Sequence, residues 1–214
     1  MEGIIFDFNG TMLFDKNLHE KSWREFVKQK TGHIPTDEEL QKHMHGRIAD
    51  YILSYFLKQN FSREESVKLE EEKEVIYRKM CLESDDFKLA DGLPEYLDKL
   101  KENKIPFNIA TASGYGNVKF FYENLNLGRW FKLENIIYNN GKIKSKPDPE
   151  MFIKAADIIG VDIKNCTIFE DSISGIEAAK NACAKKIVGV ASMIDKETLL
   201  NLGATEVIYD YTNL

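Results

Sequence analysis

The chain has 214 residues, of which 43% are apolar and 30% charged, a composition typical of folded globular proteins and too apolar for a disordered one. Its net charge is −6 and no basic stripe stands out, so nucleic acid is not expected as a partner. The three cysteines form no CxxC pair, no apolar run approaches the roughly 18 residues of a membrane span, and no signal peptide is evident. We expect a monomer in the cytoplasm, with reduced thiols and no membrane partner.

The first predicted element is a short buried strand at residues 3–8 (GIIFDF), which ends in a tight loop at Gly10. Four later apolar runs also read as strands, at residues 106–111, 166–170, 186–190 and 206–209. Amphipathic helical stretches lie between them, at residues 93–103, 115–126, 149–160, 174–183 and 195–202. This alternation predicts an α/β fold, a parallel sheet with helices on both faces. Asn139-Asn140-Gly141 predicts a hairpin-like turn that decorates this core.

Residues 15–85 interrupt the alternation of strands and helices. They contain only helical periodicity and no convincing strand, so they predict an all-helical unit inserted after the first strand. The charged run from Arg63 to Glu74 is interpreted as a solvated helix face rather than a partner-binding surface, with Glu64 and Lys68 four residues apart.

Polar groups cluster at the ends of three predicted strands, where ligands bind in open parallel sheets. These groups are Asp7 with Asn9-Gly10-Thr11, then Thr111-Ala112-Ser113, then Glu170-Asp171. Lys146 precedes the helix that is predicted to begin near Pro149. Neighbouring carboxylates repel one another unless a cation binds among them, and hydroxyls with a lysine can hold phosphate oxygens. The sequence therefore predicts a phosphate site that also holds a divalent metal.

Four segments, FDFNGT, TAS, KPDPEMF and FEDSISGIEAAKNA, resemble in order and spacing the four motifs of the haloacid-dehalogenase superfamily. The chain is most similar to the phosphatase and phosphoglucomutase-like branch, in which a helical cap follows the first motif. The resemblance covers essentially the whole chain. It implies a Rossmann-like α/β core of residues 1–14 and 86–214 and a helical cap subdomain of residues 15–85.

The same resemblance implies a Mg²⁺-dependent phosphatase that acts on a small phosphorylated metabolite such as a sugar phosphate. Asp7 would be the nucleophile that takes the phosphoryl group as an aspartyl phosphate. The Asp7 side chain, the backbone carbonyl of Asn9 and the Asp171 side chain would bind Mg²⁺. Glu170 would be a further metal ligand or, equally well, a hydrogen-bonding residue.

The phosphoryl group and the rest of the substrate would have their own binding residues. By resemblance, Thr111, the amide of Ala112 and Ser113 would bind the phosphoryl group, and Lys146 would neutralise its charge. Phosphoryl transfer depends mainly on such positioning and charge stabilisation.

In this branch the cap selects the leaving group. His19 and Trp23 lie four residues apart on one helix face and resemble a His and a Trp of β-phosphoglucomutase, although His19 could equally be a packing residue. Arg47 and Lys79 are candidates for contact with a second anionic group of the substrate, against the alternative that they are surface cations.

Asn9 departs from the pattern, because the family's phosphatases usually carry there an Asp that serves as general acid and base. An amide cannot do this, and such catalysis is worth about 10²–10⁴-fold. The protein could be a slow or leaving-group-selective phosphatase, a catalytically impaired phosphometabolite-binding protein, or a chain with an engineered Asp-to-Asn change. We favour the first, because Lys146 and Asp171 are both present. A phosphosugar mutase like β-phosphoglucomutase is the alternative enzyme, but it needs the missing acid in both half-reactions.

Overall fold

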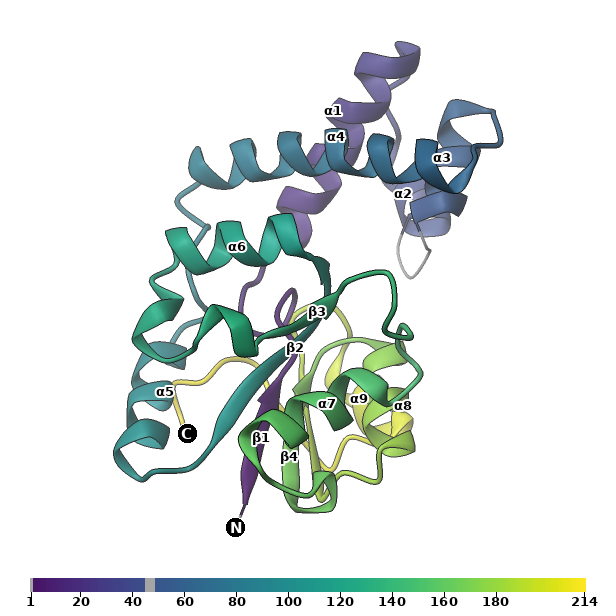
Figure 1. The fold of residues 1–214 in the computed structure, drawn as a ribbon. Helices are drawn as coiled ribbons and strands as arrows, with labels where there is room; N and C mark the ends of the chain where they lie inside the picture. Colours follow the sequence, from purple (N-terminus) through teal and green to yellow (C-terminus); the bar gives the residue numbers. More distant parts are fainter. Residues whose placement is uncertain (1, 45–48) are drawn as a thin grey trace. The chain divides into compact units, whose positions relative to one another are not determined.

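The structure is a computed structural model, and it describes residues 2–44 and 49–214. Its contacts divide the chain into two compact units. The first, here called the α/β unit, comprises Met1–Phe14 and Phe87–Leu214, and the second, the helical unit, comprises Asp15–Asp86. Figure 1 traces both units along the chain.

The α/β unit contains one parallel sheet, which confirms the predicted fold class. Its six strands are ordered β3-β2-β1-β4-β5-β6. They span Gly3–Phe6 (β1), Phe107–Gly114 (β2), Ile137–Asn139 (β3), Cys166–Glu170 (β4), Lys186–Val190 (β5) and Glu206–Ile208 (β6). The chain builds β2 and β3 on one side of β1 and then crosses to β4 on the other side. This reversal next to β1 marks the carboxyl ends of the central strands as the place where ligands usually bind in such sheets.

The helices of this unit match the predicted ones to within two residues at each end. They are α5 (Leu93–Glu102), α6 (Tyr115–Asn124), α7 (Glu150–Ile159), α8 (Ile173–Asn181) and α9 (Lys196–Leu202). Short 3-10 turns lie at Leu127–Arg129, Leu133–Asn135 and Ile163–Asn165.

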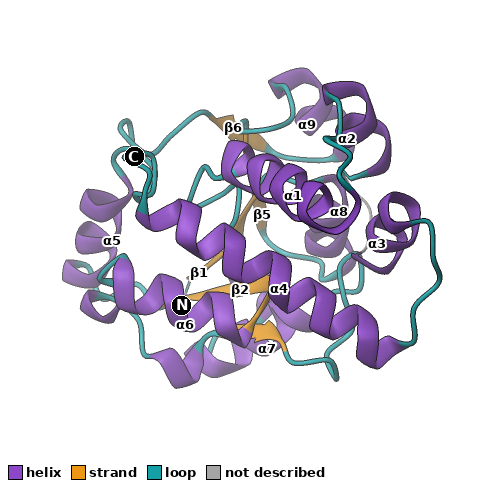
Figure 2. Cartoon of the chain, turned by 90° about the horizontal axis from the view of Figure 1, so that it is seen from above, coloured by secondary structure: helices purple, strands orange, loops and turns teal. Residues whose placement is uncertain are grey.

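Both faces of the sheet, drawn in orange in Figure 2, are covered by helices of the α/β unit, with α7 and α8 on one face and α5 on the other. Because successive strand residues point to opposite faces, the side chains of Ile5 and Phe6 in β1 pack on opposite faces of the sheet. Ile5 belongs to the apolar cluster built with α7, α8 and α9. The Phe6 ring stacks on Phe169 of β4, with ring centroids 4.9 Å apart, and lies edge-on to Tyr96 of α5.

Several details of the sheet differ from the sequence predictions: β2 runs on to Gly114, three residues past its predicted end, and β6 ends one residue early at Ile208. Residues 137–139 form β3, an edge strand parallel to β2, so the hairpin-like turn predicted at Asn139-Asn140-Gly141 is instead a turn that leaves the sheet. The Asn139 side chain stabilises this turn by accepting a hydrogen bond from the Gly141 amide at 3.0 Å. Strand β1 ends at Phe6, two residues before the predicted end, which leaves residues 7–9 in a loop.

The helical unit consists of α1 (Lys16–Thr31), α2 (Asp37–His43), α3 (Ala49–Leu57) and α4 (Arg63–Leu82). Its apolar core joins the first three helices and includes Trp23, Phe26, Val27, Leu53 and Phe56. Helix α4 begins with a capping box between Ser62 and Glu65, which satisfies free amides of its first turn. None of the helices in residues 2–44 and 49–214 is both long and apolar enough to cross a membrane.

Candidate active site

The carboxyl ends of β1 and β4 lie level with each other, which brings their polar residues together. Phe6 is paired in register with Phe169, and the next amide, that of Asp7, donates a hydrogen bond to the Phe169 carbonyl at 3.0 Å. Asp7 therefore lies beside Glu170, the last residue of β4. On the other side of β1, β2 ends with Thr111 to Gly114 at the same edge of the sheet.

Three buried carboxylates and one lysine form the centre of this edge. Asp7, Glu170 and Asp171 each place a carboxylate oxygen within 4.8 Å of the other two. The Lys146 ammonium lies 2.5 Å from Asp7 Oδ1 and 2.7 Å from Glu170 Oε2, with 6% of its side chain exposed. One positive charge thus faces three groups that can each carry a negative charge, and the cluster is short of cations.

The protonation of Lys146 follows from these contacts. Burial alone would lower the pKa of Lys146, but the carboxylates of Asp7 and Glu170 raise it above its ordinary value. The ammonium therefore remains charged. It also lies 4.8 Å from the ring centroid of Phe152 in α7, a distance at which the ring attracts a cation.

Glu170 is fully engaged by hydrogen bonds from the protein. Its Oε2 accepts from Lys146, and its Oε1 accepts from the Asp171 amide and from both the amide and the hydroxyl of Ser172. Ser172 also caps α8 by accepting from the Gly175 amide at 3.1 Å. A Cβ on Gly175 would lie 1.9 Å from the Glu170 carboxyl carbon, so only glycine lets α8 approach this closely. These contacts favour a role for Glu170 in positioning Lys146 over direct contact with a metal.

Asp171 lies against the loop that follows β1. Its Oδ1 accepts a hydrogen bond from the Thr11 hydroxyl at 3.1 Å. Gly10 has a φ of +80°, and a Cβ there would lie 2.1 Å from Asp171 Oδ2. The pKa of Asp171 is raised well above its ordinary value, first by burial and then by the neighbouring carboxylates of Glu170 and Asp7. A bound cation would remove this penalty. The oxygen-only donor set of Asp7 and Asp171 therefore fits a hard divalent ion such as Mg²⁺.

Asn9 is held by the end of β2. The Ser113 hydroxyl donates a hydrogen bond to Asn9 Oδ1 at 2.7 Å, between residues 104 positions apart in the chain. The Thr111 hydroxyl, which is buried, accepts from the Ser113 amide at 3.2 Å, and Ala112 between them is exposed. The loop after β1 and the end of β2 thus form one hydrogen-bonded wall of the site.

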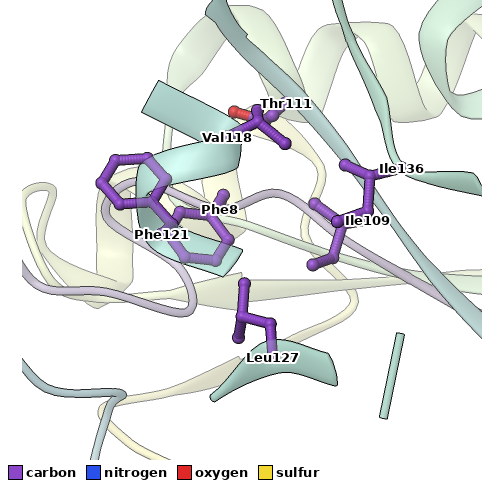
Figure 3. A pocket seen from close by; sticks show the side chains of 7 residues that line it. All are labelled: Phe8, Ile109, Thr111, Val118, Phe121, Leu127 and Ile136. Carbon is purple, nitrogen blue, oxygen red and sulfur yellow. The ribbon is translucent and has the colours of Figure 1, made fainter. Parts of the chain in front are cut away.

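Apolar side chains around Phe8 pack against the loop after β1 and the end of β2. Phe8 lies between Asp7 and Asn9 in the chain and stacks on Phe121 of α6, with ring centroids 4.6 Å apart. Figure 3 shows these two rings beside Val118, Ile109 and Leu127, with the Thr111 hydroxyl at the edge of the group. The group leaves no room for a water molecule, so it is packing that anchors the loop rather than a ligand pocket.

His19, predicted to contact the substrate, is held inside the helical unit. Its Nδ1 lies 3.0 Å from the Lys73 ammonium, and its Nε2 lies 3.2 Å from Asp15 Oδ2. Because an ammonium can only donate, Nδ1 accepts and Nε2 carries the hydrogen that Asp15 accepts. The ring also stacks on Tyr77, with centroids 4.1 Å apart. Both ring nitrogens of His19 are therefore engaged.

The other residues predicted in this unit have different surroundings. Trp23 is buried in the core of the helical unit. The side chain of Lys79 is 77% exposed and lies 3.9 Å from a carboxylate oxygen of Glu83. Arg47 lies outside the residues that the structure describes.

Sequence reasoning missed Ser172, which holds Glu170 in the carboxylate cluster, and Lys73, which holds His19 in the helical unit. Ser172, which binds Glu170 and caps α8, could have been found, because a serine just before the start of a predicted helix is a capping signal. Lys73 could not, since it stands in the charged run that predicted a solvated face and yet only 1% of it is exposed. Glu64 and Lys68 in that run are exposed and lie 2.9 Å apart, as the run predicted.

Comparisons with known proteins agree with this geometry. The sequence model of a protein family described as haloacid dehalogenase-like hydrolase matches residues 1–182. A phosphorylated carbohydrates phosphatase of Thermotoga maritima is 29% identical over 213 residues, which cover 97% of this chain and 94% of that protein. A beta-phosphoglucomutase of Bacillus subtilis is 25% identical over 187 residues, with coverage of 85% and 80%. The crystal structure of a HAD hydrolase, family IA, variant 3, from Entamoeba histolytica has a TM-score of 0.95 and 38% identity, and the match covers 100% of this chain and 95% of that one.

Proposed function

The chain belongs to the haloacid dehalogenase-like hydrolases, and on this basis we propose that it is a phosphatase acting on a small phosphorylated carbohydrate. The observation that carries the proposal is the buried cluster of Asp7, Glu170, Asp171 and Lys146 at the carboxyl ends of adjacent strands. The similarity to a phosphatase of phosphorylated carbohydrates over nearly the whole chain supports the substrate class.

In the proposed reaction, Asp7 is the nucleophile. One of its carboxylate oxygens attacks phosphorus, an O–P bond forms, and the ester P–O bond breaks with its electron pair on the leaving oxygen. Water then hydrolyses the resulting aspartyl phosphate and restores Asp7. Mg²⁺, held by the side chains of Asp7 and Asp171 and the backbone carbonyl of Asn9, would supply positive charge to the phosphoryl oxygens.

The remaining residues are proposed to position the substrate and to stabilise the charge of its phosphoryl group. Lys146 is proposed to neutralise charge that develops on the phosphoryl group, and its bond to Glu170 keeps the ammonium in place. Thr111, the amide of Ala112 and Ser113 are proposed to bind phosphoryl oxygens, since they line the same edge of the sheet. Residues 15–85 are proposed to be the substrate-selecting cap, in which Lys73 and Asp15 hold His19.

Asn9 is proposed to make the enzyme slow, because an amide cannot supply the general acid and base. A phosphosugar mutase is the second candidate, supported by the similarity to a beta-phosphoglucomutase. We place it second because its two half-reactions would both need the missing acid. A non-catalytic binding protein ranks third, because it would have no use for Lys146 beside Asp7.

The test is phosphate release from a panel of sugar phosphates, measured with Mg²⁺ and with EDTA, for the unmodified protein and for Asp7→Asn. The proposal expects release that requires Mg²⁺ and is lost in Asp7→Asn. Interconversion of sugar phosphates without release would identify the mutase. Binding of these compounds without turnover would identify the binding protein.

A further inference from the structure

The loop that follows β1 receives hydrogen bonds from two side chains near the end of the chain. We call residues 7–13 the β1 loop, and Asp7 is its first residue. Resting on the proposed phosphatase function, we infer that Ser192 and Tyr211 are positioning residues that hold this loop. They fix where Asp7 stands relative to Asp171, the other side chain proposed to bind Mg²⁺.

The β1 loop needs such support because its strand has ended. The loop turns on itself, since the Phe8 carbonyl accepts hydrogen bonds from amides three to five residues later. Within this turn, the Gly10 carbonyl accepts from the Ser192 hydroxyl at 2.5 Å. The Thr11 carbonyl accepts from the Tyr211 hydroxyl at 3.2 Å. Gly10 and Thr11 are buried, where a carbonyl that loses its partner is costly, so the two hydroxyls fix the backbone of the turn.

The residues held by these hydroxyls also contact Asp171. The Thr11 hydroxyl donates to Asp171 Oδ1 at 3.1 Å. Gly10 passes so close that a Cβ there would lie 2.1 Å from Asp171 Oδ2. A shift of the turn therefore changes its contacts with Asp171 and moves Asp7, which stands three residues before Gly10. Misplacement of a reacting group by about 1 Å can cost about a hundredfold in rate.

The Tyr211 side chain is itself fixed by its surroundings. Only 1% of the residue is exposed, and its ring centroid lies 5.6 to 6.2 Å from those of Phe6, Tyr96 and Phe169. Its amide donates to the Asp91 carbonyl at 2.9 Å. Figure 1 shows this last segment of the chain, in yellow, returning to the C-terminus beside α5. A hydroxyl on a ring held in this way can define the position of the β1 loop.

Ser192 reaches the β1 loop from the end of β5. It follows that strand by two residues, and its amide donates to the Val190 carbonyl at 2.9 Å. Because β5 pairs in parallel with β4, its carboxyl end lies at the same edge of the sheet as the candidate site. Ser192 and Tyr211 stand outside the four sequence motifs and beyond residues 1–182, which the family model matches. Their contacts with the β1 loop therefore come from the fold and not from any motif.

The experiment removes single hydroxyl groups. Tyr211→Phe loses one bond to the β1 loop and keeps the ring. Tyr122→Phe is its matched control, because the Tyr122 hydroxyl also donates to a backbone carbonyl at 3.2 Å, that of Phe131, which is not part of the loop. Ser192→Ala loses the other bond, and Ser192→Thr restores a hydroxyl at the same position.

Each protein is measured in two ways, at a temperature where all are folded. The first is hydrolysis of 4-nitrophenyl phosphate at increasing Mg²⁺ concentration, which gives kcat, KM and the Mg²⁺ concentration for half-maximal rate. The second needs no substrate: it is the shift of the urea unfolding midpoint between EDTA and saturating Mg²⁺, which reports binding of the metal to the folded protein.

Tyr211→Phe and Ser192→Ala should lower kcat by about tenfold to a hundredfold and change KM less, because the loop is misplaced while the substrate's binding groups remain. Both should need more Mg²⁺ for half-maximal rate and show a smaller Mg²⁺ shift of the midpoint, since Asp7 and Asp171 no longer keep their separation. Tyr122→Phe should unfold at lower urea in EDTA but keep the kcat and the Mg²⁺ shift of the unmodified protein. Ser192→Thr should recover most of the kcat lost in Ser192→Ala.

A kcat or a Mg²⁺ shift equal to that of the unmodified protein in both Tyr211→Phe and Ser192→Ala would overturn the inference and leave the phosphatase function standing. An equal loss of kcat in Tyr122→Phe would also overturn it, because any lost hydrogen bond would then suffice. An unmodified protein that neither releases phosphate nor is stabilised by Mg²⁺ would refute the proposed function, and the inference with it. Ser192 is partly exposed, so its two variants give the answer even if Tyr211→Phe fails to fold.

Discussion

The Lys146 ammonium bonds to carboxylates from two different strands, Asp7 after β1 and Glu170 at the end of β4. Replacing it in Lys146→Met keeps the length of the stem and removes the charge. We expect a loss of about 3–5 kcal/mol of stability, the usual result of leaving buried charges unpaired, together with a large fall in kcat/KM. Denaturant unfolding and steady-state phosphate release measure the two effects.

Lys144→Met is the matched control for this variant. Lys144 lies two residues away, its side chain is 74% exposed, and it lies 3.5 Å from Asp148. The control should change stability by less than about 1 kcal/mol and leave turnover intact. Equal effects of the two substitutions would mean that the charge of Lys146 stabilises neither the buried carboxylates nor the reaction.

The raised pKa of Asp171 gives a pH dependence with a definite sign. An acid whose pKa is higher in the folded than in the unfolded protein favours folding below the unfolded pKa of about 3.9, and loses that contribution as pH rises through the folded pKa. In metal-free protein at neutral pH, Asp171→Asn should therefore be more stable than the unmodified protein. The difference should vanish as pH falls toward 4.

Saturating Mg²⁺ should reverse this order, because the metal stabilises only the protein that retains the carboxylate. Urea unfolding at pH 4 and at neutral pH, each with EDTA and with Mg²⁺, compares the stability of Asp171→Asn with that of the unmodified protein under all four conditions. If Asp171→Asn is less stable than the unmodified protein in EDTA at neutral pH, the carboxylate is not repelled by its neighbours as described.

The approach of helix α8 to strand β4 depends on a single missing side chain. A Cβ at Gly175 would lie 1.9 Å from the Glu170 carboxyl carbon, so Gly175→Ala must displace either the helix or the carboxylate. We expect a loss of about 1–3 kcal/mol, the usual cost of overpacking, and a lower kcat as Lys146 loses its support. Thermal unfolding and phosphate release measure these effects.

Gly114→Ala is the control for the stability effect, because nothing lies within 4 Å of a Cβ placed there and its φ is not positive. It should cost at most about 1 kcal/mol, the difference between glycine and alanine at a helix N-cap. A Gly175→Ala protein that is as stable as this control would show that α8 can move away from Glu170 without loss of stability.

The elements of the sheet were predictable where the local pattern was strong. Strand β4 at Cys166–Glu170 and β5 at Lys186–Val190 coincide with the predicted runs, because each is an apolar β-rich segment bounded by turn residues. Strand β3 was not predicted, since three residues at a sheet edge carry no periodicity. Its place is decided by pairing with β2, a tertiary contact that no local pattern contains.

At the scale of the whole chain, the alternation of strands and helices was enough to predict a parallel sheet and therefore a site at its carboxyl edge. It was enough to nominate Asp7, Lys146, Glu170 and Asp171, which the structure brings together. The alternation could not predict which side chain each of these polar groups contacts. The bond from Ser113 to Asn9 spans 104 residues, and the burial of Lys73 depends on packing between helices.

If Asp7 accepts the phosphoryl group in the proposed reaction, that group can be located on the chain during turnover. The protein would be incubated with Mg²⁺ and 4-nitrophenyl phosphate, quenched in acid, digested and mapped by mass spectrometry. We expect one phosphoryl group at Asp7, and none in Asp7→Asn. A phosphoryl group on another residue, or phosphate release that persists in Asp7→Asn, would contradict it.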